Sequence, residues 1–509
     1  MRCTLCCTLR CTLCRAGADL ASPSIHRHPR SPRHIGFFIV IAKRFLITAI
    51  LFCCFMGTGF AEIYLGQGTM SGEVTSTSVL LQTRLTVTEK LDEKGDIPGA
   101  AGVVNFRWSR HQDFRDAQTT PPVKALPRHD FIVRTSLQGL EPATTYYFRA
   151  VFGDTPQSTQ EGPVCSFKTL PGAGSDNDVR FIVGSCMNYN KFMYGKAGKA
   201  GDVITATEED KRLGFPAFVA MKRLQPDFFV GTGDIVYYDN QLNDAQQISE
   251  LRQCWHEQFR FPRMIEFFRD VPGYWSKDDH DFRFNDSDNS SDRLPMPATG
   301  IELFREQVPI AAMDDHQSPT YRTHRVNQSL QIWLTEGRDF RSPNRMADGP
   351  EKTLWGAEQS QWLRKTLKAS DAKWKILISP TPMVGPDDAK KKDNHTNLGG
   401  FRHEAEEFFD WMEENKIDNL MTICGDRHWQ YHSIHPKGIN EFACGALNDE
   451  NARVGVAPGS RKGTDPEGLI EQPYTYPSPT GGFIMVEAGD ELVIQFFDDQ
   501  GEQLYRVVK

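Results

Sequence analysis

Pro226-Asp-Phe-Phe-Val-Gly-Thr-Gly-Asp-Ile-Val-Tyr-Tyr-Asp239 is the stretch that predicts the fold of the chain. Its residues 228–230 form a continuous apolar run, which is typical of a strand buried on both faces of a sheet. Glycines on both sides of Thr232 then end the strand and allow a sharp turn. Asp234 and Tyr237 follow at the carboxyl end of the strand, where open α/β sheets place their ligand sites.

Three further apolar strands end in residues of the same chemical kind. They lead into Gly184-Ser-Cys186, Lys277-Asp-Asp-His-Asp281 and Gly425-Asp-Arg-His428. Alone, each motif has a simpler interpretation, such as a buried cysteine, a solvated acidic loop or a helix cap. Together, at four strand ends, they favour a metal site. Helical patterns alternate with these strands and predict an α/β domain; they cover residues 215–224, 354–367 and 405–415.

The length of 509 residues predicts two domains, and the composition, with 39% hydrophobic and 24% charged residues, is that of a globular protein. Residues 1–61 differ, because they hold one acid, Asp19, and seven of the twelve cysteines. Lys43-Arg44 precedes an apolar run, residues 45–55, that is too short to span a bilayer comfortably. We interpret residues 1–61 as a leader and signal peptide cleaved after Ala61, rather than as an uncut membrane anchor.

The remaining chain would carry 65 acidic and 50 basic side chains, which argues against a nucleic-acid or anionic membrane surface. Five cysteines would remain, which is too few for a disulfide framework. We therefore expect an exported, periplasmic or extracellular monomer that acts on small molecules and has no membrane span after cleavage. Two Cys-x2-Cys pairs near the start resemble zinc ligands, but they fall within the leader.

Residues 62–170 show short alternating strands separated by turn clusters, which predicts an all-β sandwich. Leu140-Glu-Pro-Ala-Thr-Thr-Tyr146 resembles the signature of fibronectin type III domains, whose tyrosine closes a corner of the sandwich. Pro171-Gly-Ala-Gly-Ser-Asp-Asn-Asp178 is the expected linker to a catalytic domain over residues 179–509.

The catalytic half resembles the alkaline phosphatase D family of the calcineurin-like metallophosphoesterases. The matching stretches are those around Cys186, Asp234, His280 and His428, together with residues 334–341 and 355–363. The resemblance implies a four-layer αββα fold, preceded by the β-sandwich. It also implies iron held by Cys186, Asp234, Tyr237 and His428, and a neighbouring metal, calcium in some members, held with Asp279 and Asp426. Thiolate and phenolate suit ferric iron, and carboxylates suit calcium or other divalent metals.

The implied reaction is hydrolysis of phosphate monoesters or diesters by a metal-activated hydroxide. His280 is the candidate proton donor to the leaving oxygen, with Asp281 as the partner that sets its tautomer. Arg427 is the candidate phosphate contact. No histidine follows the strand at residues 374–378, where many relatives have a metal ligand. His395 is a candidate replacement from the next loop; the alternative is a surface histidine.

Two further expectations concern this loop and the function class. Lys390-Lys-Lys392 could attract phosphate, but a solvated charge run is the favoured interpretation. The alternative function is an extracellular adhesion or carbohydrate-binding protein with an inactive hydrolase domain. The complete set of charged ligands argues against it. A nucleotide- or phospholipid-cleaving enzyme with the same chemistry is a third hypothesis. The choice between monoesters and diesters depends on the shape of the cleft, which is formed by the loops at residues 187–214, 239–263 and 285–330.

Overall fold

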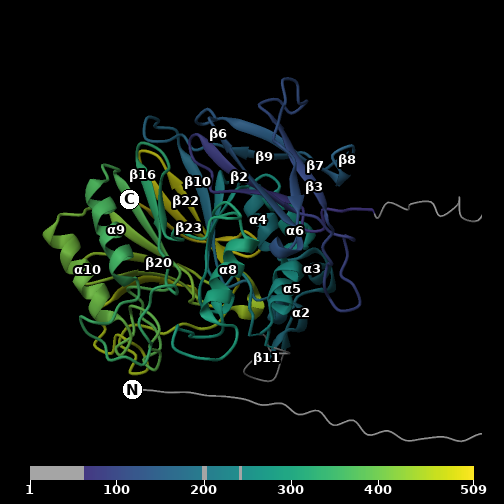
Figure 1. Cartoon of the computed structure of the whole chain (residues 1–509). Coiled ribbons are helices and arrows are strands. Elements are labelled where there is room, and N and C mark those ends of the chain that lie inside the picture. Colours follow the sequence, from purple (N-terminus) through teal and green to yellow (C-terminus); the bar gives the residue numbers. More distant parts are fainter. Residues whose placement is uncertain (1–61, 198–202, 240–243) are drawn as a thin grey trace, which may run out of the picture. The chain divides into compact units, whose positions relative to one another are not determined.

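The computed structural model describes residues 62–197, 203–239 and 244–509 (Figure 1). The predicted leader, signal peptide and cleavage site therefore lie outside the described residues. Among the described residues, no helix is both long and apolar enough to cross a membrane.

A nine-stranded sheet contains the strand predicted from residues 228–230. Its order is β24-β23-β22-β10-β13-β14-β1-β2-β6. The bounds are β1 Thr69–Gly72, β2 Ser78–Arg84, β6 Ile132–Gln138, β10 Val179–Gly184, β13 Phe228–Thr232, β14 Gly273–Ser276, β22 Gly482–Ala488, β23 Leu492–Asp498 and β24 Gln503–Val508. β13 is buried along its whole length, because it lies between the parallel strands β10 and β14.

A second, seven-stranded sheet carries the last of the four predicted strand ends. Its order is β15-β16-β17-β18-β20-β19-β21. The bounds are β15 Arg322–Arg325, β16 Leu330–Leu334, β17 Trp374–Ser379, β18 Leu420–Cys424, β19 Gln430–Ile434, β20 Asn440–Cys444 and β21 Glu471–Thr475. β16, β17, β18 and β20 run parallel to their neighbours in that series.

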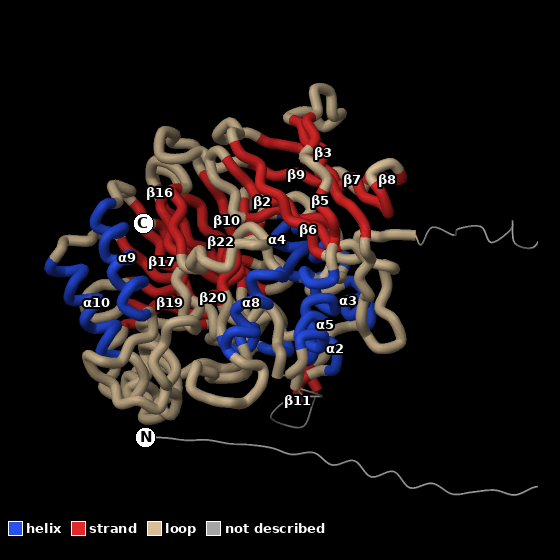
Figure 2. The backbone as a smooth tube through the Cα atoms, in the orientation of Figure 1, coloured by secondary structure: helices blue, strands red, loops and turns tan. Residues whose placement is uncertain are grey.

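Helices cover the outer face of each sheet, and a shared apolar core fills the space between the sheets. Phe228 of β13 and Ile376 of β17 belong to this inner core. Phe229 points the other way and packs under α4 Ala217–Arg223, α5 Ile248–Phe259, α6 Pro262–Phe268 and α8 Pro297–Gln307. α9 Gly356–Ala369 and α10 Arg402–Glu414 cover the second sheet (Figures 1 and 2). The predicted αββα arrangement is confirmed.

The short elements sit in the connections. They are η1 Pro127–His129, α2 Tyr189–Tyr194, β11 Lys196–Ala197, β12 Val203–Ile204, α3 Glu208–Leu213, α7 Asp279–Phe282 and η2 Asp449–Asn451. The helix predicted over residues 215–224 corresponds to α4, and those over 354–367 and 405–415 correspond to α9 and α10.

The strands of the N-terminal β region are divided between two sheets. Six of its strands form a separate sheet, namely β3 Gly102–Ser109, β4 Gln118–Thr119, β5 Val123–Ala125, β7 Thr145–Thr155, β8 Ser158–Glu161 and β9 Cys165–Lys168. β1, β2 and β6 instead extend the nine-stranded sheet, because β1 pairs parallel to β14 at Gly72 and Gly273. Tyr146 makes the expected corner: its hydroxyl accepts a hydrogen bond from the backbone N–H of Glu141 at 2.9 Å.

A buried charge network joins the N-terminal β region to α5. Asp130 accepts hydrogen bonds from Arg84 Nη2 at 3.0 Å, from His256 Nε2 at 2.6 Å and from Gln307 Nε2 at 2.9 Å. The second ring nitrogen of His256 lies 2.5 Å from Asp96. Burial opposes ionisation of Asp130, but the bonds from His256 and the charge of Arg84 outweigh it and hold its pKa well below the usual range.

We expect Asp130→Asn to lower the melting temperature at pH 7, because removing one partner of a buried ion pair costs about 3–5 kcal/mol. Asparagine tolerates the positive φ of 52° at this position, so the backbone should keep its conformation. The depressed pKa means that the stabilisation is present above the unfolded pKa, near 4, and is lost as the pH falls. The melting temperatures of wild type and variant should therefore draw closer as the pH falls below about 4 and converge only near the lowered pKa of Asp130.

Asp116→Asn is the matched control, because Asp116 has a similar φ of 58° and is exposed. Equal melting temperatures for wild type and Asp130→Asn at pH 7 would contradict the proposed contribution of this network to stability.

Candidate metal centre

The site is formed where strands of both sheets end. β10, β13 and β14 are parallel neighbours, so the residues that follow them meet at one edge. These residues are Cys186, Asp234 and Asp279, and the turn after β18 adds Asp426 and His428 from the second sheet.

Three of these residues occupy the left-handed backbone region, with φ of 56° at Cys186, 55° at Asp234 and 61° at Asp426. That conformation is uncommon outside glycine and concentrates at functional sites. Gly233 has φ of 87°, and a Cβ there would lie 2.6 Å from Cβ of Asp278. The turn therefore needs glycine in order to bring two strand ends together.

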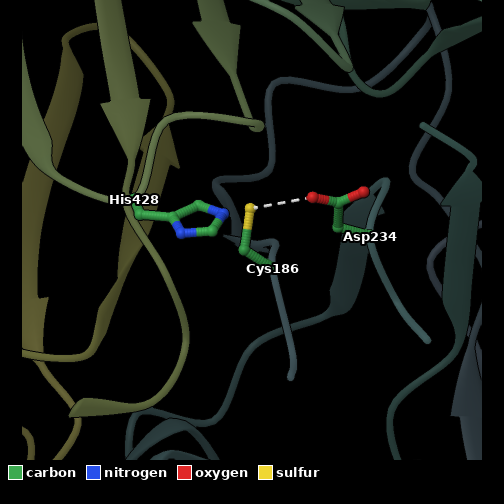
Figure 3. Close-up of side chains that lie close together, drawn as sticks. All are labelled: Cys186, Asp234 and His428. Carbon is green, nitrogen blue, oxygen red and sulfur yellow. Dashed lines mark hydrogen bonds between the residues drawn. The ribbon is translucent and has the colours of Figure 1, made fainter. Parts of the chain in front are cut away.

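The first group of possible ligands is Cys186, Asp234 and His428, whose donor atoms all lie within 4.8 Å of one another (Figure 3). Cys186 Sγ lies 3.5 Å from Asp234 Oδ2, and the Tyr237 hydroxyl lies 3.2 Å from the same oxygen. The structure thus brings together the four residues predicted to surround one metal. Asn451, which belongs to no motif in the sequence, donates to the Tyr237 hydroxyl at 3.1 Å.

Asp234 also belongs to a second group, with Asp279 and His280. Its carboxylate therefore lies between two clusters, as expected for a bridging ligand. A third group consists of Asp279, Asp286 and Asp393. Sequence reasoning missed Asp286 and Asp393, because they lie in loops rather than directly after apolar strands. The only signal was that Asp393 opens the polar segment that contains His395.

His280 has a different partner from the predicted one. Its Nδ1 lies 2.5 Å from Asp239 Oδ1, and its ring lies 4.1 Å from that of Tyr237, measured between centroids. Asp281 instead accepts hydrogen bonds from the backbone N–H groups of Asp278 and Ile235. The adjacent carboxylate caps the short helix α7, and the partner of His280 comes from 41 positions earlier in the sequence.

The protonation of His280 follows from this environment. Burial alone would lower the pKa of His280, but its carboxylate neighbours, above all Asp279 and Asp234, raise it to about 10. The ring therefore holds its proton at neutral pH in the metal-free protein.

His395 and Arg427 are not where the sequence placed them. His395 is buried, its Nε2 lies 2.9 Å from Glu404, and its ring packs against Trp355. It is therefore neither a member of the three groups nor a surface residue. Arg427 is fully buried, and its guanidinium donates to Asp387 and Asp426. Both ends are thus occupied by carboxylates, which leaves its predicted phosphate contact unsupported.

Asp426 and Lys391 also differ from expectation. Asp426 is held by Arg427 and does not join the three groups. Lys391 is only partly exposed, and its Nζ lies 2.6 Å from Asp286 and 4.0 Å from Asp393. It is a charged neighbour of the third group rather than part of a solvated run.

The donor set fits metal ions. Buried oxygens of Asp278, Asp279 and Asp393 have no hydrogen-bond partner among the described residues. Burial and the surrounding carboxylates raise the pKa of Asp234 well above its usual range, and burial with Asp234 does the same for Cys186. Acidic groups forced together in this way need cations to offset their repulsion.

Comparison with known structures identifies the class of fold. A solved structure of PhoD has a TM-score of 0.66 and 19% identity, with 87% of this chain and 88% of that chain covered. A purple acid phosphatase from yellow lupin (Lupinus luteus) has a TM-score of 0.56 and 12% identity over 88% of this chain and 74% of that chain. The fold is that of the metallophosphoesterase class.

Comparison with models of protein families identifies the family. Residues 181–472 match the PhoD-like phosphatase family and residues 58–171 match its N-terminal domain, so the chain belongs to the PhoD-like phosphatase family. Alkaline phosphatase D of Bacillus subtilis (strain 168) is 22% identical over 417 residues, which cover 72% of this chain. The chain spans 64% of the length of that curated relative.

Proposed function

We propose that the protein is a metal-dependent phosphoester hydrolase. The observation that carries this proposal is the convergence of Cys186, Asp234, Tyr237 and His428 at the strand ends of both sheets, with a second group sharing Asp234. Metal ions bound there would neutralise the phosphate charge and acidify a water molecule.

The residues of the chain have separable roles in this proposal. Cys186, Tyr237 and His428 would hold one metal and Asp279 would hold its neighbour, since the Asp234 carboxylate belongs to both groups of possible ligands. His280 keeps a proton in reach of the leaving oxygen, because Asp239 fixes its orientation and the carboxylates favour its charged form. Arg427 acts as a positioning residue that fixes Asp426 and Asp387.

Phosphate monoesters and diesters are the substrate classes to test. The experiment is a panel of both, measured on metal-loaded protein beside protein stripped with a chelator. We expect turnover of at least one class and its loss on stripping, with recovery when metal is restored. Absence of turnover across the panel with full metal content would favour the inactive binding protein instead.

Iron and calcium are the metals proposed from the ligand types. If iron is bound by Tyr237 and Cys186, the purified protein should absorb visible light through ligand-to-metal charge transfer, because phenolate and thiolate are electron-rich ligands. Tyr237→Phe should shift or remove that band, whereas Tyr194→Phe, an exposed tyrosine on α2, should not. Elemental analysis identifies the metals, and an active, colourless, iron-free enzyme would exclude iron.

Export stays a prediction from residues 1–61. We expect the native protein outside the cytosol, as a monomer that begins near Glu62. N-terminal sequencing of protein purified from its source checks this, and native protein that retains Lys43 in the cytosol would contradict it.

A further inference from the structure

Three cationic side chains converge on one segment beside the metal centre. Lys191 of α2 donates from Nζ to Asn451 Oδ1 at 2.7 Å, and Lys196 of β11 donates to the carbonyl of Ala452 at 2.6 Å. Arg453 is the next residue of the same segment. We call Lys191, Lys196 and Arg453 the cationic rim.

The cationic rim is tied directly to the candidate ligands. Asn451, which accepts from Lys191, donates to the Tyr237 hydroxyl at 3.1 Å and to the carbonyl of Cys186 at 3.0 Å. The backbone N–H of Arg453 donates to the carbonyl of His428 at 2.9 Å. The Tyr476 hydroxyl also bridges the carbonyls of His428 and Arg453.

None of the three cations has a carboxylate oxygen within 4.0 Å in the part of the chain that the structure describes. This contrasts with Lys277, Arg338, Lys391 and Arg427, which all pair with carboxylates around the same centre. Arg453 is exposed, and its guanidinium lies 5.1 Å from the centre of the Trp429 ring, which holds it in place.

Having no paired carboxylate among the described residues is unfavourable for Lys191 in particular. Its side chain is partly buried, and burial together with the charges of Lys196 and Arg453 lowers its pKa to about 8. An anion placed among the three groups would relieve both the repulsion and the desolvation.

We propose that the cationic rim binds a second phosphate group of the substrate, distinct from the phosphate that is hydrolysed. This inference rests on the proposed phosphoester hydrolase function and narrows its substrate class. The enzyme should prefer molecules that carry two phosphates a few atoms apart over those with a single phosphate. Guanidinium and ammonium groups are suited to such an anion, since charge-assisted hydrogen bonds are the stronger ones.

The test compares kcat/KM for propane-1,3-diyl bisphosphate with that for 3-hydroxypropyl phosphate, on metal-loaded enzyme. These substrates differ only in the second phosphate, apart from the twofold statistical advantage of two equivalent ends. We expect the wild-type ratio to exceed about tenfold and to fall about tenfold in Arg453→Met and in Lys191→Met, the scale of one charge-assisted hydrogen bond. Lys124→Met, an exposed lysine of β5, is the charge-matched control and should keep the wild-type ratio.

Two results would overturn the inference. A wild-type ratio near the statistical factor would show that the second phosphate is not recognised. Equal losses on both substrates in Arg453→Met would show that the rim contacts the phosphate being hydrolysed.

A binding measurement separates failure of the inference from failure of the proposed function. Calorimetry with propane-1,3-diylbisphosphonate and propylphosphonate, which are not hydrolysed, needs no turnover. If the bisphosphonate binds more tightly and Arg453→Met removes this difference, the rim binds a second phosphate even if neither substrate is cleaved. Equal affinities for the two ligands would refute the proposed binding of a second phosphate, even in an active enzyme.

Discussion

Asp234→Asn should abolish turnover while the protein stays folded. Asp234 lies within reach of both the Cys186 and the Asp279 groups, so in the proposed centre its charge would serve two metals at once. Asparagine has nearly the same size and tolerates the φ of 55°. Mutating a residue that only hydrogen-bonds to a metal ligand typically lowers metal affinity or activity about 10–100-fold. Loss of a ligand shared by two metals should therefore cost more, about 10³-fold or above in kcat/KM.

Metal content and stability make this result specific. We expect elemental analysis to show loss of metal from both groups, with an unchanged far-UV circular dichroism spectrum. Stripped of metal, Asp234→Asn should melt no lower than stripped wild type, because a buried carboxylate among other carboxylates destabilises the fold. Asp286→Asn, a matched change confined to the third group, should cost less activity. Wild-type turnover in Asp234→Asn would exclude the proposed centre.

His280→Ala should discriminate between substrates by their leaving groups. An alkoxide leaves poorly without a proton, whereas nitrophenolate is stable as an anion. General acid catalysis typically contributes about 10²–10⁴-fold, so we expect a loss of that size on alkyl phosphates and a much smaller one on nitrophenyl phosphate.

Metal analysis separates the possible roles of His280. If His280 is a metal ligand, metal should be lost and both substrates should fall together. Equal losses with full metal content would assign it to orienting the phosphate. Asp239→Asn is the companion variant: it leaves the imidazole in place but removes the negative charge beside Nδ1. We expect it to reproduce part of the leaving-group dependence of His280→Ala.

The sequence by itself determined the architecture of the catalytic half. Apolar runs such as residues 228–230 are buried on both faces, so burial alone selects a central strand. The helices covering 217–223, 356–369 and 402–414 follow from the 3.6-residue spacing of their apolar side chains. Cys186, Asp234 and Tyr237 could be selected because the carboxyl ends of neighbouring parallel strands meet at one edge, whatever the intervening loops do.

Only the tertiary structure decided the partners of those residues. Asp239 rather than Asp281 contacts His280. The guanidinium of Arg427 donates to Asp387, a residue forty positions away. His395 turns to Glu404, while Asp393 from the same loop joins Asp279. Each of these choices depends on how loops from different strands pack. Local patterns specify which face of an element is buried, but the direction of a polar side chain is set by distant groups that satisfy its charge and hydrogen bonds.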